Sequence, residues 1–122
     1  STYIYALTAQ TNIFISPVAS AILGYSPEEL RELGSDLSFL LIHPDDKERS
    51  RERLEKFFSS EGDEVIELEY RMRRKDRNYV WLNDRARVFR RDSFGRPTQI
   101  LGVATDITLR KAAEDARQQF IT

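Results

Sequence analysis

Three stretches in the second half of the chain alternate between apolar and polar residues, which is the pattern of half-buried β-strands. In residues 65–72 every second side chain is apolar, and most of the side chains between them are charged. Residues 78–89 continue the alternation after the link Lys75-Asp76-Arg77, which has the length of a three-residue hairpin loop. A second turn at residues 92–97 leads to a last strand at residues 98–107. The pattern predicts three antiparallel strands.

The register of the first of these hairpins can be predicted from charge. When Arg74 pairs with Asn78, opposite charges and a cation–π pair meet on the outer face, and no like charges clash. The outer pairs are Glu67 with Arg85, Glu69 with Asn83, Arg71 with Trp81 and Arg73 with Tyr79; the inner pairs are Ile66 with Ala86, Leu68 with Asp84, Tyr70 with Leu82 and Met72 with Val80. The residue that closes such a loop has positive φ, and here that residue is Arg77. Glycine adopts positive φ at a lower conformational free energy than arginine does.

The first half of the chain combines a hairpin with short helices. β-Branched and aromatic residues at 3–7 and 12–15 flank a polar link and predict two paired strands. Ser16-Pro17 and Ser26-Pro27 each predict a helix start, because serine caps free amides and proline fits the first turn. The second start also has a capping-box glutamate, Glu29. We expect the first helix to bury Val18, Ala19, Ile22 and Leu23.

A third helix start lies at His43-Pro44-Asp45-Asp46, where acidic residues favour the positive end of the helix dipole. We expect this helix to end near Phe58 and to point Leu54, Phe57 and Phe58 inward. The run contains the only histidine of the chain, and a structural role for it is favoured over metal ligation. The two adjacent aspartates are interpreted as helix caps in preference to a magnesium site.

The end of the chain changes from strand to helix at the polar sequence Asp106-Ile107-Thr108. Apolar residues of this helix recur at the four-three-four spacing of a two-stranded coiled coil. They are Leu109, Ala113, Ala116 and Phe120. We expect one domain at residues 1–108 and the start of a coiled-coil linker helix at residues 109–122. Asp106 and Thr108 form the predicted junction, which passes a conformational or dimerisation state to the segment that follows the domain.

Composition limits the class of the protein. A chain of 122 residues with 40% hydrophobic content has the size of one domain. Its 19 basic and 20 acidic residues nearly balance, so bulk charge attracts neither nucleic acid nor anionic lipid. The absence of cysteine excludes disulfides, thiolate metal sites and a cysteine nucleophile. The longest apolar run, Phe39 to Ile42, is far shorter than the roughly 20 residues of a membrane span, so we expect a cytoplasmic domain without direct membrane contact.

Four elements of the sequence, in their order and spacing, resemble a bacterial PAS domain with its C-terminal PAC motif. They are Phe14-Ile15-Ser16-Pro17 with residues 23–30, His43-Pro44-Asp45-Asp46, Glu69-Tyr70-Arg71 with Tyr79-Val80-Trp81, and Asp106-Ile107-Thr108-Leu109-Arg110-Lys111. The resemblance covers almost the whole chain. It implies an α+β fold with a five-stranded antiparallel sheet in the order 2-1-5-4-3 and short helices that enclose a pocket on one face. The sequence departs from the family at Arg77, where the usual turn has glycine.

The resemblance also implies a sensor or relay module in a bacterial signalling protein. It implies no catalytic residues, and an output domain of the histidine kinase or diguanylate cyclase type downstream in the same chain. The alternative is a ligand-free dimerisation scaffold. The sequence does not identify a cofactor. The missing cysteine excludes a cysteinyl-flavin adduct, and the helix at residues 46–58 lacks the histidine that haem-binding members use, which argues against haem.

The inner face of the predicted sheet supplies the candidate pocket residues. They are Phe57, from the third helix, with Tyr70, Met72, Leu82, Asp84, Gly102 and Ala104. Asp84 is a carboxylate among apolar neighbours, so it needs a partner. It contacts either a ligand or, as we favour, an arginine or backbone amides. The small residues Gly102 and Ala104 leave space that is either a pocket or is filled by Tyr70 and Phe57.

The outer face of the sheet combines basic and apolar residues. Nine basic residues lie between Arg71 and Arg91, but glutamates interleave with them, so a solvated face or a protein interface is favoured over a nucleic-acid surface. The apolar stripe on this face consists of Trp81, Leu101, Val103 and Ile107. Such a stripe marks an interface, and we expect a homodimer through this face and the C-terminal helix.

Overall fold

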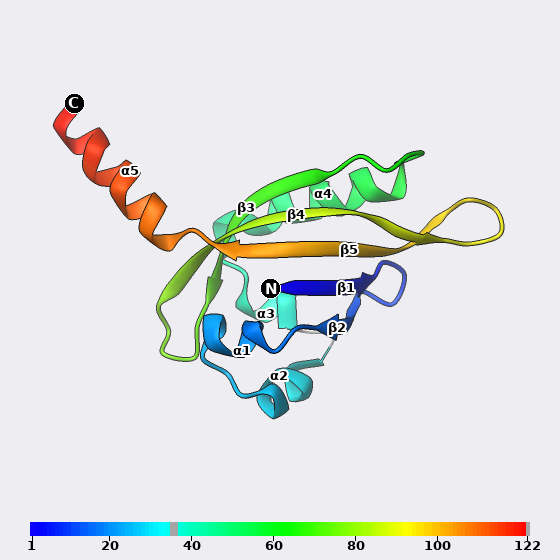
Figure 1. Ribbon diagram of the computed structural model, residues 1–122, viewed down its shortest axis with the longest axis horizontal. Coiled ribbons are helices and arrows are strands. Elements are labelled where there is room, and N and C mark those ends of the chain that lie inside the picture. The colour runs from blue at the N-terminus through cyan, green and yellow to red at the C-terminus, as the bar shows by residue number, and fades with distance from the viewer. Residues whose placement is uncertain (35–36, 122) are drawn as a thin grey trace.

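The computed structural model describes residues 1–34 and 37–121, and its centre is one antiparallel sheet (Figure 1). The strands are β1 (Thr2–Ala6), β2 (Thr11–Ile15), β3 (Ile66–Arg73), β4 (Tyr79–Arg91) and β5 (Pro97–Asp106). Their order is β2-β1-β5-β4-β3, which confirms the predicted topology. The first and last strands of the sequence therefore lie side by side in the middle of the sheet.

The β3–β4 hairpin has the register predicted from charge. All eight predicted pairs, from Ile66 with Ala86 to Arg73 with Tyr79, are present. Arg77 has φ of 73°, as expected for the residue that closes the three-residue loop. Its backbone amide donates to the carbonyl of Arg74 at 2.9 Å. Alternation and charge pairing were sufficient here because both strands are adjacent in sequence.

Replacing Arg77 with glycine is expected to raise the free energy of unfolding by about 0.5–1 kcal/mol, because glycine adopts positive φ without a Cβ clash. Thermal denaturation of the wild type and Arg77→Gly would measure the difference. An unchanged or lower melting temperature would show that the loop does not strain its arginine. The exposed Arg73, with ordinary φ, provides the control: Arg73→Gly should be destabilising instead.

Short α-helices and a 3₁₀ turn, η2, precede β3 in the described part of the chain. They are α1 (Val18–Leu23), α2 (Pro27–Leu33), α3 (Leu37–Leu41), η2 (Pro44–Asp46) and α4 (Lys47–Phe58). The capping box predicted at Ser26 and Glu29 is present, with both hydrogen bonds formed. The prediction of a Ser16 cap is wrong. Pro17 takes the N-cap position of α1, where no side chain caps the helix.

Two side chains predicted to be buried are exposed. Val18 lies at the first position of α1 and is exposed, whereas Ala19 and Leu23 are buried and Ile22 is partly buried against the core. Phe58 is the last residue of α4, one position past the inward-facing Phe57, so it points to solvent. In both cases a hydrophobic residue next to a helix end lies outside the buried stripe.

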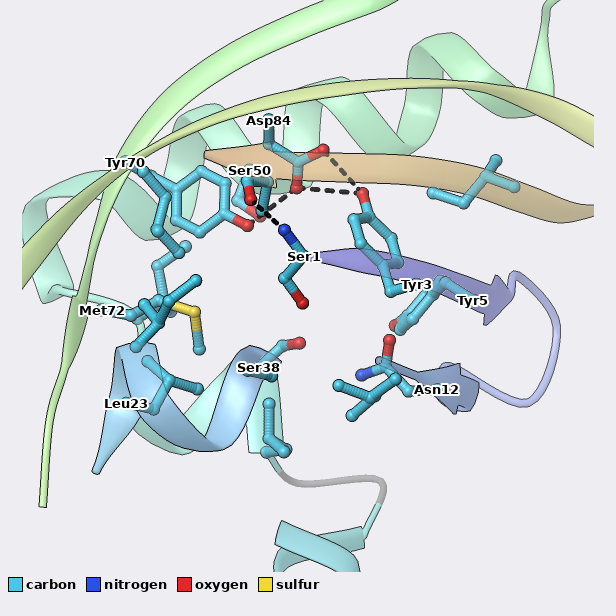
Figure 2. Close-up of a pocket in the computed structure, with 18 of the residues that line it drawn as sticks. Ser1, Tyr3, Tyr5, Asn12, Leu23, Ser38, Ser50, Tyr70, Met72 and Asp84 are labelled. Carbon is cyan, nitrogen blue, oxygen red and sulfur yellow. Dashed lines mark hydrogen bonds between the residues drawn. The ribbon is translucent and has the colours of Figure 1, made fainter. Parts of the chain in front are cut away.

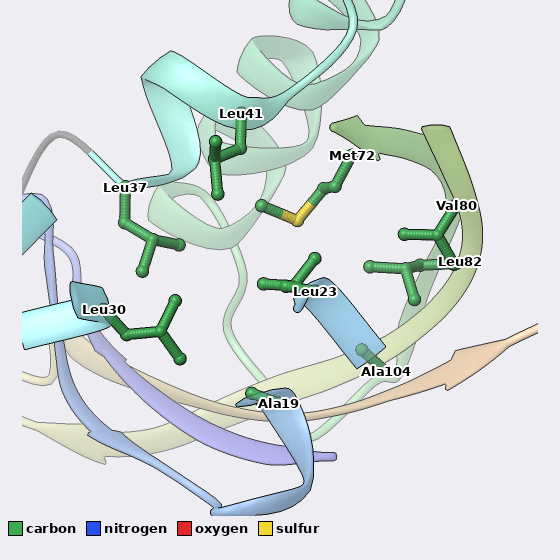
Figure 3. Close-up of a cluster of buried hydrophobic side chains, with 9 residues drawn as sticks. All are labelled: Ala19, Leu23, Leu30, Leu37, Leu41, Met72, Val80, Leu82 and Ala104. Atoms are coloured by element: carbon green, nitrogen blue, oxygen red, sulfur yellow. The ribbon is translucent and has the colours of Figure 1, made fainter. Parts of the chain in front are cut away.

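The four helices cover one face of the sheet and form two apolar clusters with it. The first contains Ala19, Leu23, Leu30, Leu37, Leu41, Met72, Val80, Leu82 and Ala104 (Figure 3). The second contains Leu7, Phe57, Ala86, Val88 and Ile100. On β4 the two clusters are separated by Asp84, which lies between Leu82 and Ala86 on the same face. A buried polar group thus divides the core.

The C-terminal helix α5 (Thr108–Ile121) projects away from the sheet (Figure 1). None of its residues is buried, and the predicted seam residues Leu109, Ala113, Ala116 and Phe120 are all exposed. Thr122, the last residue of the predicted linker, lies outside the described residues. Within the described part of the chain, no helix has the length and apolar character needed to cross a membrane.

Candidate ligand cavity and signal junction

A cavity of about 150 Å³ lies between the inner face of the sheet and the helices (Figure 2). Six of the seven predicted pocket residues line it: Phe57, Tyr70, Met72, Leu82, Asp84 and Ala104. The cavity wall is mostly apolar, with side chains from α1, α2, α3 and α4 opposite the strands. The predicted inner-face residues are therefore brought together around one space.

Gly102 is the exception, because Tyr3 covers it. Tyr3 pairs with Gly102 across β1 and β5, and its ring lies over the glycine. A Cβ at residue 102 would lie 2.3 Å from Cζ of Tyr3, so no larger residue fits without moving the ring. The space above this glycine was expected to be open or to be filled by Tyr70 and Phe57, but Tyr3 fills it.

Asp84 is 2% exposed and accepts hydrogen bonds from three side chains. The Tyr3 hydroxyl donates to both carboxylate oxygens, at 2.8 and 2.9 Å. The Tyr70 hydroxyl donates to Oδ2 at 2.7 Å, and Arg53 Nη2 donates to Oδ1 at 3.0 Å. Arg53 Nη2 also donates to the carbonyl of Ile66 at 2.8 Å. The expected pairing of Asp84 with an arginine is therefore present, and two tyrosines complete its coordination.

Burial and the neighbouring carboxylate keep both tyrosines protonated. Burial raises the pKa of Tyr3 far above its usual value, and the charge of Asp84 raises it further. The same two causes raise the pKa of Tyr70. Burial, the largest single cause, lowers the pKa of Arg53, but the charges of Asp84, Tyr3 and Tyr70 and the hydrogen bond to Asp84 together outweigh it, so the net shift is upward. The site therefore contains one ion pair and two neutral hydroxyls.

Arg53 and Tyr3 are the site residues that sequence reasoning missed. Arg53 is buried although it lies in a helix rich in charged residues. Arg53 lies four residues before Phe57, so both residues lie on the same face of the helix. This spacing was the sequence feature that could have identified Arg53 as a site residue. For Tyr3, no local signal exists, because its partner Gly102 is 99 positions away along the chain.

The strand-to-helix junction is held by hydrogen bonds between Asp106 and Thr108 and by hydrogen bonds to Trp81, near the start of β4. Asp106 Oδ1 accepts from the backbone amide of Thr108 at 2.9 Å and from its hydroxyl at 2.6 Å. Thr108 Oγ1 accepts from the backbone amide of Trp81 at 3.1 Å. The amide of Ile107 donates to the carbonyl of Trp81 at 2.9 Å. The start of α5 is thus hydrogen-bonded to both the backbone N–H and the backbone C=O of Trp81.

The first turn of α5 is also bound to the outer face of the sheet. Lys111 Nζ lies 2.8 Å from Oε1 of Glu69 and 4.6 Å from the centre of the Trp81 ring. Arg110 pairs with the other oxygen of Glu69. The Arg71 guanidinium lies 4.8 Å from the same Trp81 ring, as the register predicted. Trp81 therefore contacts both its cross-strand neighbour and the projecting helix.

This combination of a helix-covered sheet, a cavity between sheet and helices and an exposed terminal helix agrees with the comparisons to known proteins. The family model described as the PAS fold matches residues 12–104. The chain belongs to the PAS family. PAS domains are sensory and regulatory modules that sit within multidomain signalling proteins and commonly dimerise.

Relatives of this PAS domain include sensor proteins. The methyl sulfide methyltransferase-associated sensor of Methanosarcina acetivorans is 34% identical over 93 residues, which are 76% of this chain and 9% of that protein. The sensory box histidine kinase/response regulator of Burkholderia thailandensis has a solved structure that is 26% identical, with a TM-score of 0.78, over 96% of this chain and 83% of that one. The N-terminal domain of a Marinobacter aquaeolei diguanylate cyclase with a PAS/PAC sensor is 23% identical, with a TM-score of 0.75, over 90% and 96%.

The outer face of the PAS domain differs from the predicted stripe at one residue. Val103 is 48% exposed, and Trp81 and Leu101 are half-buried. Ile107 is only 8% exposed, because it follows the last residue of β5 and is held against the Trp81 backbone. Ile107 therefore cannot contribute to an exposed interface, and the stripe reduces to the other three residues.

The run at the start of α4 has a structural role that differs from the predicted caps. His43 Nδ1 accepts from the amide of Asp45 at 3.0 Å, and its ring packs 4.7 Å from that of Tyr79. Asp46 makes no side-chain cap, so that prediction is wrong for this residue. It is buried and instead binds Arg71 of β3. Among the described residues, no group of three His, Asp or Glu side chains is arranged to hold a metal ion.

Proposed function

We propose that this PAS domain binds a small molecule in the cavity and passes the bound state through Asp106 and Thr108 to an output domain downstream. The observation that supports this most strongly is that cavity and junction share two strands. Asp84 and Ala104 line the cavity, and Trp81 and Asp106 on the same strands, β4 and β5, hold the start of α5. A change at these positions of the cavity wall is therefore two or three residues from the junction.

The relatives favour an output domain of the histidine kinase or diguanylate cyclase type. The Burkholderia and Marinobacter proteins carry these names, and each contains a domain of this fold. In such a protein the PAS domain acts as a regulatory, non-catalytic module. The runner-up is a ligand-free dimerisation scaffold, and the cavity, with the Asp84 network in its mostly apolar wall, favours the ligand-binding alternative.

Asp106→Ala is expected to uncouple input from output while the domain stays folded. The substitution removes both hydrogen bonds that Thr108 donates to Asp106, and these bonds are at the surface, so the cost in stability is about 1 kcal/mol. Signalling by the full-length protein measures the coupling, with Asp115→Ala on the exposed part of α5 as the matched control. Wild-type signalling in Asp106→Ala would show that the junction does not transmit the state.

We further propose that the outer face and α5 form a homodimer. Val103 is exposed on the outer face beside Leu101, opposite Arg85, and Trp81 lies further along the same face next to α5. The seam residues of α5 have no partner within the described chain. Val103→Glu is expected to weaken self-association by about tenfold or more, because it places a charge in an apolar contact. Sedimentation velocity would measure this. Val18→Glu is the control, because Val18 on α1 is also an exposed valine. If both variants weakened self-association equally, the outer face would be excluded as the interface.

A further inference from the structure

We propose that the cavity selects small uncharged molecules, about the size of one aromatic ring, that carry an O–H or N–H donor. This inference depends on the proposed function, in which the cavity is the ligand site. It follows from three properties of the cavity wall: its hydrogen-bonding state, its charge and its size. Figure 2 shows the residues involved.

The polar centre of the wall offers acceptors to a ligand. A tyrosine hydroxyl has one hydrogen to donate. Tyr3 and Tyr70 both direct that hydrogen to the buried carboxylate of Asp84. Their oxygens retain acceptor lone pairs, whereas the carboxylate is already occupied by three donors. A ligand group next to these two hydroxyls therefore forms a hydrogen bond with them when it donates and none with them when it only accepts.

The charged side chains of the wall also balance each other. Arg53 and Asp84 are the charged side chains that line the cavity in the described part of the chain, and they pair with each other at 3.0 Å. A charged ligand would bring a new, uncompensated charge into a mostly apolar space, which is strongly unfavourable. The ion pair thus supplies no net attraction for an anion or a cation.

Several polar side chains around the cavity have unused hydrogen-bonding capacity. The hydroxyls of Tyr5, Ser38 and Ser50 and the side chain of Asn12 line the space, and none has a partner among the described residues. Figure 2 shows them spread around an open centre, with Leu23 and Met72 on the apolar side. Ser38 is exposed, so the cavity reaches the surface beside α3. This arrangement suits a molecule with one polar edge and an apolar body.

Size sets the upper limit. A cavity of about 150 Å³ is comparable to one that accommodates benzene. Larger cofactors occupy sites of roughly 300–1,000 Å³. Phenol and toluene are therefore suitable probes, because they have nearly the same shape and differ in one hydroxyl donor. Benzoate adds a negative charge to a ring of the same type.

Titration of the purified domain with phenol, toluene and benzoate, followed by amide chemical shifts, tests the proposal. Phenol is expected to bind at least tenfold more tightly than either of the others, with shifts centred on Tyr70, Asp84 and Ala104. Equal affinity for toluene would overturn the donor requirement, and tighter binding of benzoate would overturn the selection for uncharged molecules. Both results would leave the cavity as a ligand site. If none of the three binds, the proposed function of the cavity fails as well.

Variants of the acceptor provide a second test that does not depend on absolute affinity. Tyr70→Phe is expected to reduce the preference for phenol over toluene severalfold and to leave toluene affinity unchanged. Tyr25→Phe is the matched control, because Tyr25 packs against the core without lining the cavity. If Tyr70→Phe does not fold, Tyr3→Phe tests the other acceptor. An unchanged preference in the folded variant would contradict the role of these hydroxyls.

Discussion

Replacing Asp84 with alanine is expected to lower the free energy of unfolding by about 3–5 kcal/mol, because it leaves Arg53 charged and buried without its partner. The Tyr3 and Tyr70 hydroxyls lose their acceptor in the same step. Burial makes each unpaired group costly, since water cannot replace the lost hydrogen bond. Urea denaturation followed by circular dichroism would measure the change. Asp115→Ala, at an exposed position of α5, is the control and should change stability little.

The double variant Asp84→Leu/Arg53→Leu separates the two contributions to this effect. It removes both charges, so it should be more stable than Asp84→Leu alone. The two tyrosine hydroxyls would still lack a partner. If Asp84→Ala lost less than about 1 kcal/mol, the buried network would not be the polar centre of the core that its geometry indicates.

The second large effect is expected at Asp46, where alanine should cost about 3 kcal/mol. Asp46 is 1% exposed and accepts from Arg71 at three positions: the backbone amide at 2.8 Å, Nε at 3.0 Å and Nη2 at 2.9 Å. Arg49 adds a further bond of 2.8 Å. The carboxylate ties the start of α4 to β3, so its loss should loosen the helix that lines the cavity. Urea denaturation of Asp46→Ala, compared with Asp45→Ala at the exposed neighbouring position, would measure the difference.

The same site predicts a pH dependence. Burial alone would raise the pKa of Asp46, but the hydrogen bonds from Arg71 and Arg49 outweigh it and hold the pKa well below its usual value. The folded state therefore binds this proton less readily than the unfolded chain does. Its stabilisation is complete above the unfolded pKa of about 4 and is lost as the pH falls below it. Stability curves of the wild type and Asp46→Asn between neutral and acidic pH should converge. Parallel curves would contradict this assignment.

The strands could be predicted from the sequence because their information is local. Alternation located β3, β4 and β5, and the charges of Glu67 and Arg85 helped to fix a register that the structure confirms. The order of the sheet came from the family resemblance. Asp84 was correctly placed inside because alternation leaves no other face for it.

Contacts between distant segments could not be predicted in the same way. Tyr3 covers Gly102 because β1 pairs with β5, and nothing near either residue indicates that contact. Asp46 has the sequence context of a helix cap, but its partner is Arg71 on β3. Ile107 follows the alternation of an outer-face residue, yet the strand ends at Asp106 and the pattern no longer applies. In each case a tertiary contact or an element boundary determines the environment of the side chain.

The central claim, that the cavity and the exit helix are coupled, can be tested with the single tryptophan of the chain. Trp81 contacts Lys111 of α5 and does not line the cavity, so its indole N–H resonance reports the junction without direct contact from a ligand. Saturation with phenol is predicted to shift this resonance in the wild type and to shift it much less in Asp106→Ala. A resonance that stays in place while the cavity residues show saturation would contradict the coupling.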